Sequence, residues 1–336
     1  MAKRNAIVRR LPSVETLGCT TVICSDKTGT LTTNEMCCTR LALPISGTQM
    51  RCHTVEGHTY APIGTVEDLS IDWVRDKAIC MLARVASICN ESRLSVDLSG
   101  RCIRTGEPTE AALRVLVEKL GCPDTALCTR CLQKSRRTSR DAMAFSSYWS
   151  EDVAKLAVLE FSPTRKSMAV LGSDRSQSGN VLYVKGAPES ILDRCSSIML
   201  PDGRVEALGQ AGRQAVQEQF LGLAGEALRT LALAVKQDLR PLGLHDYDGP
   251  AHSGHSQLSD PANFVRVETD LTFVGLVGIM DPPRPECKKA IEDCRVAGIS
   301  VLMITGDNKV TAEAIAQKLG ILKSADNLKQ KSFTGK

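Results

Sequence analysis

The sequence predicts an α/β fold, in which a doubly wound domain is interrupted by a second α/β domain. Residues 19–25 and 299–304 are short β-branched runs near opposite ends of the chain, which are typical of buried parallel strands, and each is followed by polar residues. Helical patterns flank the second run, and alternating helices and strands are typical of a parallel sheet covered by helices. The long segment between the two runs contains predicted strands and helices of its own. We therefore expect a discontinuous domain with an inserted one, and ligands at the carboxyl ends of its strands.

The individual elements follow from local pattern and from residues that favour helix starts. Thr109 is positioned to cap one helix, and Pro188 suits the first turn of another. The predicted strands cover residues 19–25, 155–161, 181–185, 231–235 and 299–304. The predicted helices cover residues 109–120, 188–199, 214–228 and 285–297, and a further helix carries Ala312, Ile315, Ala316 and Leu319. Residues 132–150 and 240–262 are expected to be exposed loops, because polar residues dominate them without periodicity.

Composition limits the class of protein before any motif is considered. The chain has 336 residues, enough for two domains, and its 43% hydrophobic and 24% charged residues are ordinary for a globular protein. A net charge of +4 and an aromatic content of 4% argue against nucleic-acid binding. The longest strongly apolar stretch, residues 271–280, is shorter than the roughly 20 residues that span a bilayer. The 14 cysteines lack two paired zinc-ligand motifs, so we expect reduced thiols.

The strongest chemical signal is the heptad Asp-Lys-Thr-Gly-Thr-Leu-Thr at residues 26–32, which follows a predicted strand. A carboxylate at the carboxyl end of such a strand, here Asp26, is a candidate nucleophile that can accept a phosphoryl group. The Gly and Thr residues after it suit a tight loop whose backbone N–H groups hold phosphoryl oxygens. Charge accumulates at such a site, so Mg²⁺ is required. The plain structural alternative is that Asp26 only caps the next turn.

This heptad resembles the phosphorylation signature of the P-type ATPases, ion pumps built on a haloacid-dehalogenase-like domain. Residues 5–9 and 11–19 resemble the lead-in found in the sarco/endoplasmic reticulum calcium pumps. The resemblance covers nearly the whole chain and implies three segments. Residues 1–36 would open the phosphorylation domain, residues 37–280 would form an inserted α/β nucleotide-binding domain, and residues 281–336 would return to the phosphorylation domain.

The resemblance also implies the members of the phosphorylation site. Asp26 would accept the γ-phosphoryl group of ATP with Lys27 and Thr28 beside it, and Asp26 and Thr28 would ligate Mg²⁺. A second phosphoryl-binding motif matches Thr305, Gly306 and Asp307. In that motif the threonine bonds a phosphoryl oxygen, and the aspartate organises nucleotide and Mg²⁺. The plain alternative for the aspartate is a helix cap.

ATP binding requires a further site, because the sequence has no Gly-rich nucleotide loop of either common kind. Lys185 and Gly186 begin Lys-Gly-Ala-Pro-Glu, which resembles the family's nucleotide motif and implies that Lys185 lies beside adenine. Phe161 resembles the aromatic residue on which adenine stacks, a contact worth about 1–3 kcal/mol by analogy with nucleic-acid bases. The other positions that match nucleotide-binding segments of the family are Thr109, Glu110, Lys166, Arg229, Leu231 and Arg284. Taken singly, Phe161 is equally explained as core, Thr109 as a helix cap and Lys185 as a surface charge.

Some features depart from the family pattern or do not occur in this sequence. The family commonly has Phe-Ser-Arg-Asp-Arg-Lys where residues 161–166 read Phe-Ser-Pro-Thr-Arg-Lys, so Pro163 replaces a basic residue and weaker ATP binding is expected. Residues 281–284, Asp-Pro-Pro-Arg, match the family's hinge between the two domains. The later acidic Mg²⁺ motif, the actuator domain and the membrane helices do not occur. We therefore expect a marginally stable phosphorylation domain that is incomplete toward its C-terminus, in a chain whose partners are the remaining domains of the same pump.

The sequence thus favours the ATP-binding, aspartyl-phosphate-forming portion of a calcium pump on the cytoplasmic face of the endoplasmic reticulum. By itself such a chain would bind ATP but would be phosphorylated poorly. Calcium rests on the resemblance, and manganese-transporting secretory-pathway relatives share much of the lead-in. One alternative is a soluble phosphatase of the same superfamily, although those enzymes carry an acid where this chain has Thr28. The other alternative is a non-catalytic nucleotide-binding or interaction module.

Overall fold

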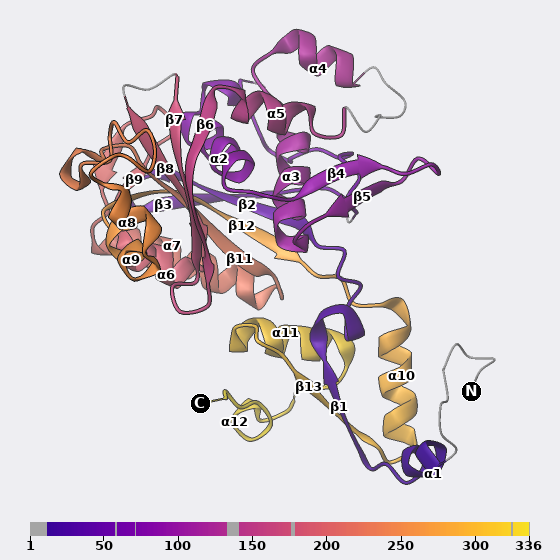
Figure 1. Ribbon diagram of the computed structural model, residues 1–336. Coiled ribbons are helices and arrows are strands. Elements are labelled where there is room, and N and C mark those ends of the chain that lie inside the picture. The colour runs from indigo at the N-terminus through magenta and orange to yellow at the C-terminus, as the bar shows by residue number, and fades with distance from the viewer. Residues whose placement is uncertain are drawn as a thin grey trace. The chain divides into compact units, whose positions relative to one another are not determined.

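The computed structural model describes residues 12–57, 59–70, 72–132, 141–175, 179–323 and 325–335. The chain divides into two compact units, which we call the terminal unit (Met1–Asn34 and Asp281–Lys336) and the central unit (Glu35–Met280) (Figure 1). The sequence predicted domain boundaries after residues 36 and 280. The lead-in at residues 5–9 lies outside the described residues.

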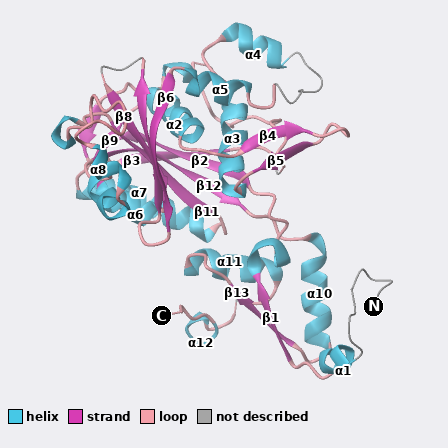
Figure 2. Cartoon of the chain, in the orientation of Figure 1, coloured by secondary structure: helices cyan, strands magenta, loops and turns pink. Residues whose placement is uncertain are grey.

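A mixed sheet forms the middle layer of the central unit, and nine strands belong to it in the described residues (Figure 2). These strands are β2 (Cys37–Ser46), β3 (Gln49–Thr54), β6 (Val153–Ser162), β7 (Ser167–Asp174), β8 (Asn180–Gly186), β9 (Cys195–Met199), β10 (Val205–Ala207), β11 (Arg229–Lys236) and β12 (Leu271–Met280). Their order is β10-β9-β12-β11-β8-β7-β6, with β2 added to β12 and β3 added to β2. One edge of β12 pairs antiparallel with β11, while its other edge pairs first with β9 in parallel and then with β2.

The helices of the central unit lie between these strands in the chain. They are α2 (Lys77–Ile88), α3 (Pro108–Leu120), α4 (Thr125–Leu132), α5 (Ala144–Glu151), α6 (Pro188–Arg194), α7 (Gln210–Gly225), α8 (His255–Ser259) and α9 (Phe264–Val267). A separate antiparallel hairpin consists of β4 (Arg93–Val96) and β5 (Cys102–Thr105). No helix in the described residues is both long enough and apolar enough to cross a membrane.

Helices cover both faces of the large sheet. On one face α2 and α3 contribute Leu82 and Leu113 to a core cluster that also contains Val277 of β12 (Figure 1). On the other face α6 contributes Ile191 to a second cluster, together with Leu276 of β12. Consecutive residues of a strand point to opposite faces, so one strand supplies both clusters. The central unit is therefore a three-layer α/β structure, and the predicted α/β class is confirmed.

The terminal unit contains a smaller sheet in its described residues. Strand β1 (Val22–Asp26) pairs in parallel with β13 (Ser300–Ile304), in a register that matches Asp26 with Ile304. The helices of this unit are α1 (Pro12–Gly18), α10 (Pro285–Val296), α11 (Lys309–Leu319) and α12 (Leu328–Lys331). The parallel pairing agrees with the prediction, but the expectation that residues 19–25 form a buried strand is wrong. Exposed and half-buried residues alternate along β1 and β13, because in the described residues no element buries the second face of this sheet.

Some predicted elements of the central unit also need correction. The helix expected over residues 188–199 ends at Arg194, and the chain continues as β9, because parallel pairing with β12 buries Ile198. The helix expected over residues 214–228 is α7, which starts four residues earlier and ends at Gly225. Long-range strand pairing, which local periodicity does not reveal, decided the first case.

The two segments predicted to be exposed loops are only partly so. Of residues 132–150, residues 133–140 lie outside the described residues, while α5 begins at Ala144. Helix α5 is fixed by the buried carboxylate of Glu118, which accepts from the backbone N–H of Ser146 at 2.7 Å. Residues 240–262 include α8, and they bury Tyr247 and Leu258 against the second core cluster. Tyr247 and Leu258, two apolar residues in an otherwise polar segment, were therefore the sequence signal that this segment packs on the core.

Candidate functional site

Asp26 is the last residue of β1 and is exposed. The chain then turns tightly through η2 (Lys27–Leu31), where Gly29 adopts φ +75°, a conformation that favours glycine. The Asp26 side chain makes no capping bond to this turn, which argues against the plain alternative of a cap. Within the described residues no side chain or backbone group bonds this carboxylate, so it is accessible for chemistry.

Lys27 lies next to Asp26 but is buried, with only 2% of its side chain exposed. Its Nζ lies 2.8 Å from Oδ2 of Asp307 and 3.3 Å from Oδ2 of Asp281. Buried lysines are rare unless an opposite charge compensates them, and here two carboxylates do so. Lys27 therefore links the start of the loop to two acids that are distant in sequence.

Asp281 is a member of this cluster that sequence reasoning did not include among the site residues. Its Oδ2 accepts a hydrogen bond from Thr32 Oγ1 at 2.7 Å, and its Oδ1 accepts from the backbone N–H of Asn34 at 3.1 Å. Thr32 Oγ1 in turn accepts from the backbone N–H of Gly29 at 3.2 Å. Asp281 thus supports both Lys27 and the turn after Asp26. The signal for it was its place at the start of Asp-Pro-Pro-Arg, which had been interpreted only as a hinge.

Arg284 binds the same loop through its side chain and its backbone. Its Nε donates to the carbonyl of Thr30 at 3.1 Å, and its Nη2 donates to the carbonyl of Gly29 at 3.0 Å. Its backbone N–H donates to the carbonyl of Leu31 at 3.0 Å. Since these bonds occupy three successive carbonyls, Arg284 holds the shape of the loop that follows Asp26.

Thr305, Gly306 and Asp307 follow β13 directly. Because Ile304 pairs with Asp26, these residues leave the sheet at the same edge as the candidate nucleophile. The backbone N–H of Asp307 donates to Thr305 Oγ1 at 3.1 Å. Asp307 is not the cap of α11, since Asn308 is the capping residue. The structure therefore brings Lys27 and Asp307 of the predicted site into contact, with Thr28 and Gly306 exposed nearby in sequence.

The residues at this edge fit a Mg²⁺ ion in part. Asp26 and the backbone carbonyl of Thr28 are hard oxygen donors, which Mg²⁺ prefers. Lys27 and Arg284 supply two positive charges against the three carboxylates of Asp26, Asp281 and Asp307, so this end of the sheet stays negative and attracts a cation. Within the described residues no three His, Cys, Asp or Glu side chains gather as a metal site. Such a site suits Mg²⁺ that keeps waters and substrate phosphate oxygens as its other ligands.

Lys185 in the central unit is buried rather than a surface charge. Its Nζ lies 2.6 Å from Oε1 of Glu110 and donates to the carbonyl of Cys89 at 2.5 Å. Burial acts to raise the pKa of Glu110, but the Lys185 ammonium and the backbone N–H groups of Glu91 and Ser92 outweigh it. The pKa of Glu110 is therefore held below its ordinary value. Lys185 and Glu110 form a preorganised ion pair that joins β8 to α3.

Thr109 precedes Glu110 in the chain, and Arg229 and Leu231 lie on β11, which pairs with the strand of Lys185, but the three side chains have different environments. Thr109 does not cap α3, because Glu107 occupies the cap position. Its Oγ1 instead accepts from Arg229 Nη1 at 3.4 Å and donates to the sulfur of Met36 at 3.3 Å. Arg229 is exposed, while Leu231 is half-buried against the first core cluster.

Phe161 and Lys166 bracket the hairpin turn between β6 and β7. Phe161 is 61% exposed, which excludes its interpretation as core. Lys166 adopts φ +54°, and its carbonyl accepts from the backbone N–H of Ala187 at 2.9 Å. A Cβ atom at Gly186 would lie 2.5 Å from that carbonyl oxygen, so only glycine fits there. Pro163, which replaces the family's basic residue, is exposed in the turn.

Strand register brings the predicted nucleotide residues to one end of the large sheet. Ser162 pairs with Ser167, Ser167 pairs with Gly186, and Gly186 pairs with Ala232. The end of β6, the start of β7, the end of β8 and the first half of β11 are therefore adjacent. Phe161, Lys166, Lys185, Gly186 and Leu231 belong to these strand ends.

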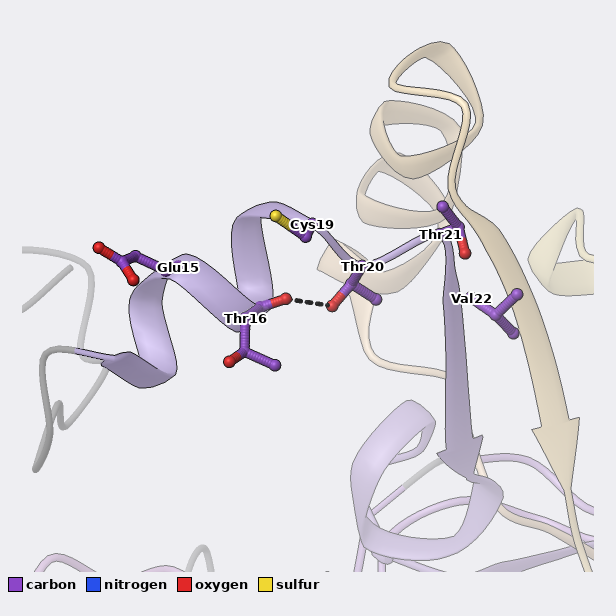
Figure 3. A pocket seen from close by; sticks show the side chains of 6 residues that line it. All are labelled: Glu15, Thr16, Cys19, Thr20, Thr21 and Val22. Carbon is purple, nitrogen blue, oxygen red and sulfur yellow. Dashed lines mark hydrogen bonds between the residues drawn. The ribbon is translucent and has the colours of Figure 1, made fainter.

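The terminal unit has a hollow in its surface (Figure 3). It is open to solvent and is found around the start of β1, whereas Asp26 is at the end of that strand. Thr20 Oγ1 donates to the carbonyl of Thr16 at 3.0 Å within it. Its lining consists of Glu15, Thr16, Cys19, Thr20, Thr21 and Val22. Since none of these is a predicted site residue, the hollow is not the candidate site.

Comparison with known proteins points to one family. Residues 78–286 match the family model described as P-type ATPase, cytoplasmic domain N. The chain is 45% identical over 344 aligned residues to calcium-transporting ATPase 2, endoplasmic reticulum-type, of Arabidopsis thaliana, with 100% of this chain and 32% of that protein covered. It is 43% identical to calcium-transporting ATPase 4, endoplasmic reticulum-type, of the same plant, with 100% of this chain and 31% of that protein covered. The chain thus spans about a third of the length of the curated relatives it matches.

Proposed function

This chain belongs to the P-type ATPases, and from that premise we propose that it is the ATP-binding and phosphoryl-accepting portion of an endoplasmic-reticulum-type calcium pump. The family resemblance predicted from the sequence is confirmed by the family match. Calcium and the endoplasmic reticulum are the ion and the membrane type in the names of the relatives, and we extend both to this chain. We further propose that the terminal unit is a haloacid-dehalogenase-like phosphorylation domain and that the central unit binds the nucleotide.

The observation that carries this proposal is the exposed, unbonded Asp26 carboxylate beside a buried Lys27. A carboxylate oxygen of Asp26 attacks the γ-phosphorus of ATP, and the bond from that phosphorus to the bridging oxygen breaks. The electron pair leaves with ADP, and an aspartyl phosphate remains. Lys27 does not take part as an acid, because its ammonium is bound by Asp281 and Asp307.

The surrounding residues have supporting roles in this proposal. Thr305 donates its hydroxyl to a phosphoryl oxygen, and Gly306 lets the backbone approach the phosphoryl group closely. Asp26 and Thr28 would hold Mg²⁺, which when bound neutralises negative charge on the phosphates. Arg284 keeps the loop after Asp26 in shape through its bonds to the carbonyls of Gly29 and Thr30.

Nucleotide binding is assigned to the sheet end that carries Phe161 and Lys185. The exposed ring of Phe161 can stack on adenine, and the Lys185–Glu110 pair supplies polar groups of fixed position beside it. Lys166 and Arg229 are exposed cations that suit the phosphates. The proposed nucleotide site also includes Thr109, Gly186 and Leu231.

Incubation of the chain with Mg²⁺ and ATP labelled at the γ-phosphate tests the proposal. Label that survives acid, is released by hydroxylamine and is lost in Asp26→Asn supports an aspartyl phosphate. As a matched control, Asp72→Asn changes an exposed aspartate of the central unit and should leave the labelling unchanged.

Other outcomes would favour the alternative functions. Sustained release of phosphate without stable label would indicate a phosphatase of the same superfamily. ATP binding without label would indicate a nucleotide-binding module. Failure of the wild-type chain to bind ATP at all would refute the nucleotide site.

A further inference from the structure

A buried ion cluster contacts the backbone of the hairpin that carries Phe161 and Lys166. Glu268, in the segment between α9 and β12, has no exposed side-chain surface. Its Oε1 lies 3.1 Å from Arg165 Nη1, and its Oε2 contacts Arg194 Nη1. Ser167 Oγ donates to the same Oε2 at 2.6 Å. The cluster therefore joins three segments that are far apart in the sequence, the hairpin at residues 165–167, Arg194 and Glu268.

Arg165 connects this ion cluster to the backbone of the hairpin. Its Nη2 donates to the carbonyl of Leu159 at 3.1 Å, to that of Ser167 at 3.0 Å, and to that of Glu160. These carbonyls lie on both strands that flank the turn. The guanidinium also lies over the ring of Phe264, 4.9 Å from its centroid. The position of this one guanidinium thus determines how β6 and β7 meet around residues 161–166.

The turn itself has little freedom to compensate for a displaced Arg165. Lys166 has φ +54°, in a region that non-glycine residues rarely adopt. Its carbonyl is bound to the backbone N–H of Ala187 and is closely approached by Gly186. A shift of the hairpin would therefore move Phe161, Lys166 and the Gly186 backbone together.

Charge makes Glu268 the critical member of the cluster. Arg165 and Arg194 both point a guanidinium nitrogen at it, and Arg194 Nη2 also donates to the carbonyl of Arg165 at 3.0 Å. Burial lowers the pKa of Arg165, and the Glu268 carboxylate acts in the opposite direction. Loss of the carboxylate charge would leave the buried Arg165 guanidinium and the largely buried Arg194 guanidinium without their shared counter-charge, which is strongly unfavourable.

We propose that Glu268 is a positioning residue for nucleotide binding, which acts through Arg165 on the turn that presents Phe161 and Lys166. This inference rests on the proposed function, because it assumes that those two side chains meet ATP. Glu268 itself touches no nucleotide. Its role is to hold a guanidinium that in turn holds the hairpin carbonyls.

The test compares ATP affinity with thermal stability for the full chain and its variants. Glu268→Gln should weaken ATP binding by about tenfold, because the guanidinium loses its counter-charge and the hairpin shifts. Glu268→Asp keeps the charge and should recover most of that loss. A thermodynamic cycle with Phe161→Ala supplies a readout that a purely structural role would not move. Once the ring is absent, Glu268→Gln should cost clearly less affinity than it does in the wild type.

The matched control is another buried ion cluster of the same unit. Arg84 pairs with Asp174 at 3.0 Å, and Asp174 also accepts from the buried Tyr183 hydroxyl. Arg84→Gln should lower Tm while the ATP affinity of the folded protein stays the same. If Glu268→Gln instead behaves like this control, the inference is overturned and the proposed function stands.

The remaining outcomes are also decisive. If the wild-type chain does not bind ATP, both the proposed function and the inference fail. If Glu268→Gln does not fold, the decision passes to Arg165→Lys, which keeps the positive charge but loses the guanidinium donors to the hairpin carbonyls and should weaken ATP binding. Unchanged ATP affinity in Arg165→Lys would overturn the inference.

Discussion

The strands β1 and β12 differ sharply in burial although each contains a run of apolar residues. Nine residues of β12, from Leu271 to Ile279, are buried, and its side chains feed both core clusters of the central unit. Along β1 no residue is fully buried, and on its partner β13 Leu302 and Ile304 are 51% and 60% exposed. A β-branched run therefore predicts a strand, whereas burial depends on whether other layers cover it.

The two units also use polar contacts differently. In the central unit the buried ion clusters, such as the one around Glu268, add to a large apolar core. In the described part of the terminal unit, Lys27 is among the most buried large side chains, with 2% exposed, and two aspartates hold its ammonium. We expect the terminal unit to depend on this ion cluster far more than the central unit depends on any one of its own.

The largest expected effect is a difference in backbone protection between the units. Native-state hydrogen exchange should show amides of β12 protected at least about a thousandfold more than amides of β1, because opening free energies range from near zero up to the global value. Both strands are measured in the same sample, so each is the control for the other. Protection of residues 22–26 equal to that of β12 would contradict the comparison drawn above.

The second effect concerns the ion cluster of the terminal unit. Lys27→Met should destabilise this unit by about 3–5 kcal/mol, because Asp281 and Asp307 would remain as largely buried carboxylates without the ammonium that compensates their charge. Unfolding followed by probes in each unit should then show the terminal unit unfolding first. Lys155→Met, at the half-exposed pair with Glu91, is the matched control and should cost no more than about 1 kcal/mol. Equal effects of the two substitutions would refute the assigned importance of Lys27.

The third effect tests how tightly the central unit is packed at its candidate site. Gly186→Ala should cost about 1–3 kcal/mol, because the added methyl would lie 2.5 Å from the Lys166 carbonyl oxygen. Chemical denaturation measures this cost directly. Gly222→Ala, in α7 with open space around it, should instead stabilise by up to about 1 kcal/mol. If both substitutions changed the free energy of unfolding in the same direction, the close packing assigned to Gly186 would be contradicted.

The smallest effect is a pH dependence that belongs to the Lys185–Glu110 pair. The pKa of Glu110 in the folded chain lies below its ordinary value of 4.5. Its contribution to stability is therefore complete above that value and is lost as the pH falls through the folded pKa. Burial of the carboxylate opposes the effect of the ion pair and limits the contribution to about 1 kcal/mol or less. In denaturation curves from pH 6 downward, Glu110→Gln should remove this part of the acid destabilisation, and an unaltered pH profile would contradict it.

Much of the site could be predicted from local sequence. The heptad at residues 26–32 marked the candidate nucleophile, and the run at residues 299–304 marked its parallel partner strand. Both signals are local, because strand propensity and turn chemistry depend on neighbouring residues. The helix predicted over residues 188–199 failed because its second half pairs with β12, far away in the chain.

What the sequence by itself determined was the α/β class, the family and the short motifs, since these depend on the order of residue types. Only the tertiary structure decided that Asp281 and Asp307 share Lys27 and that Lys185 is buried against Glu110. It also decided that Glu268 lies behind the Phe161 hairpin. The physical reason is that burial and ion pairing arise between segments brought together by packing, and no local pattern encodes which distant segments meet.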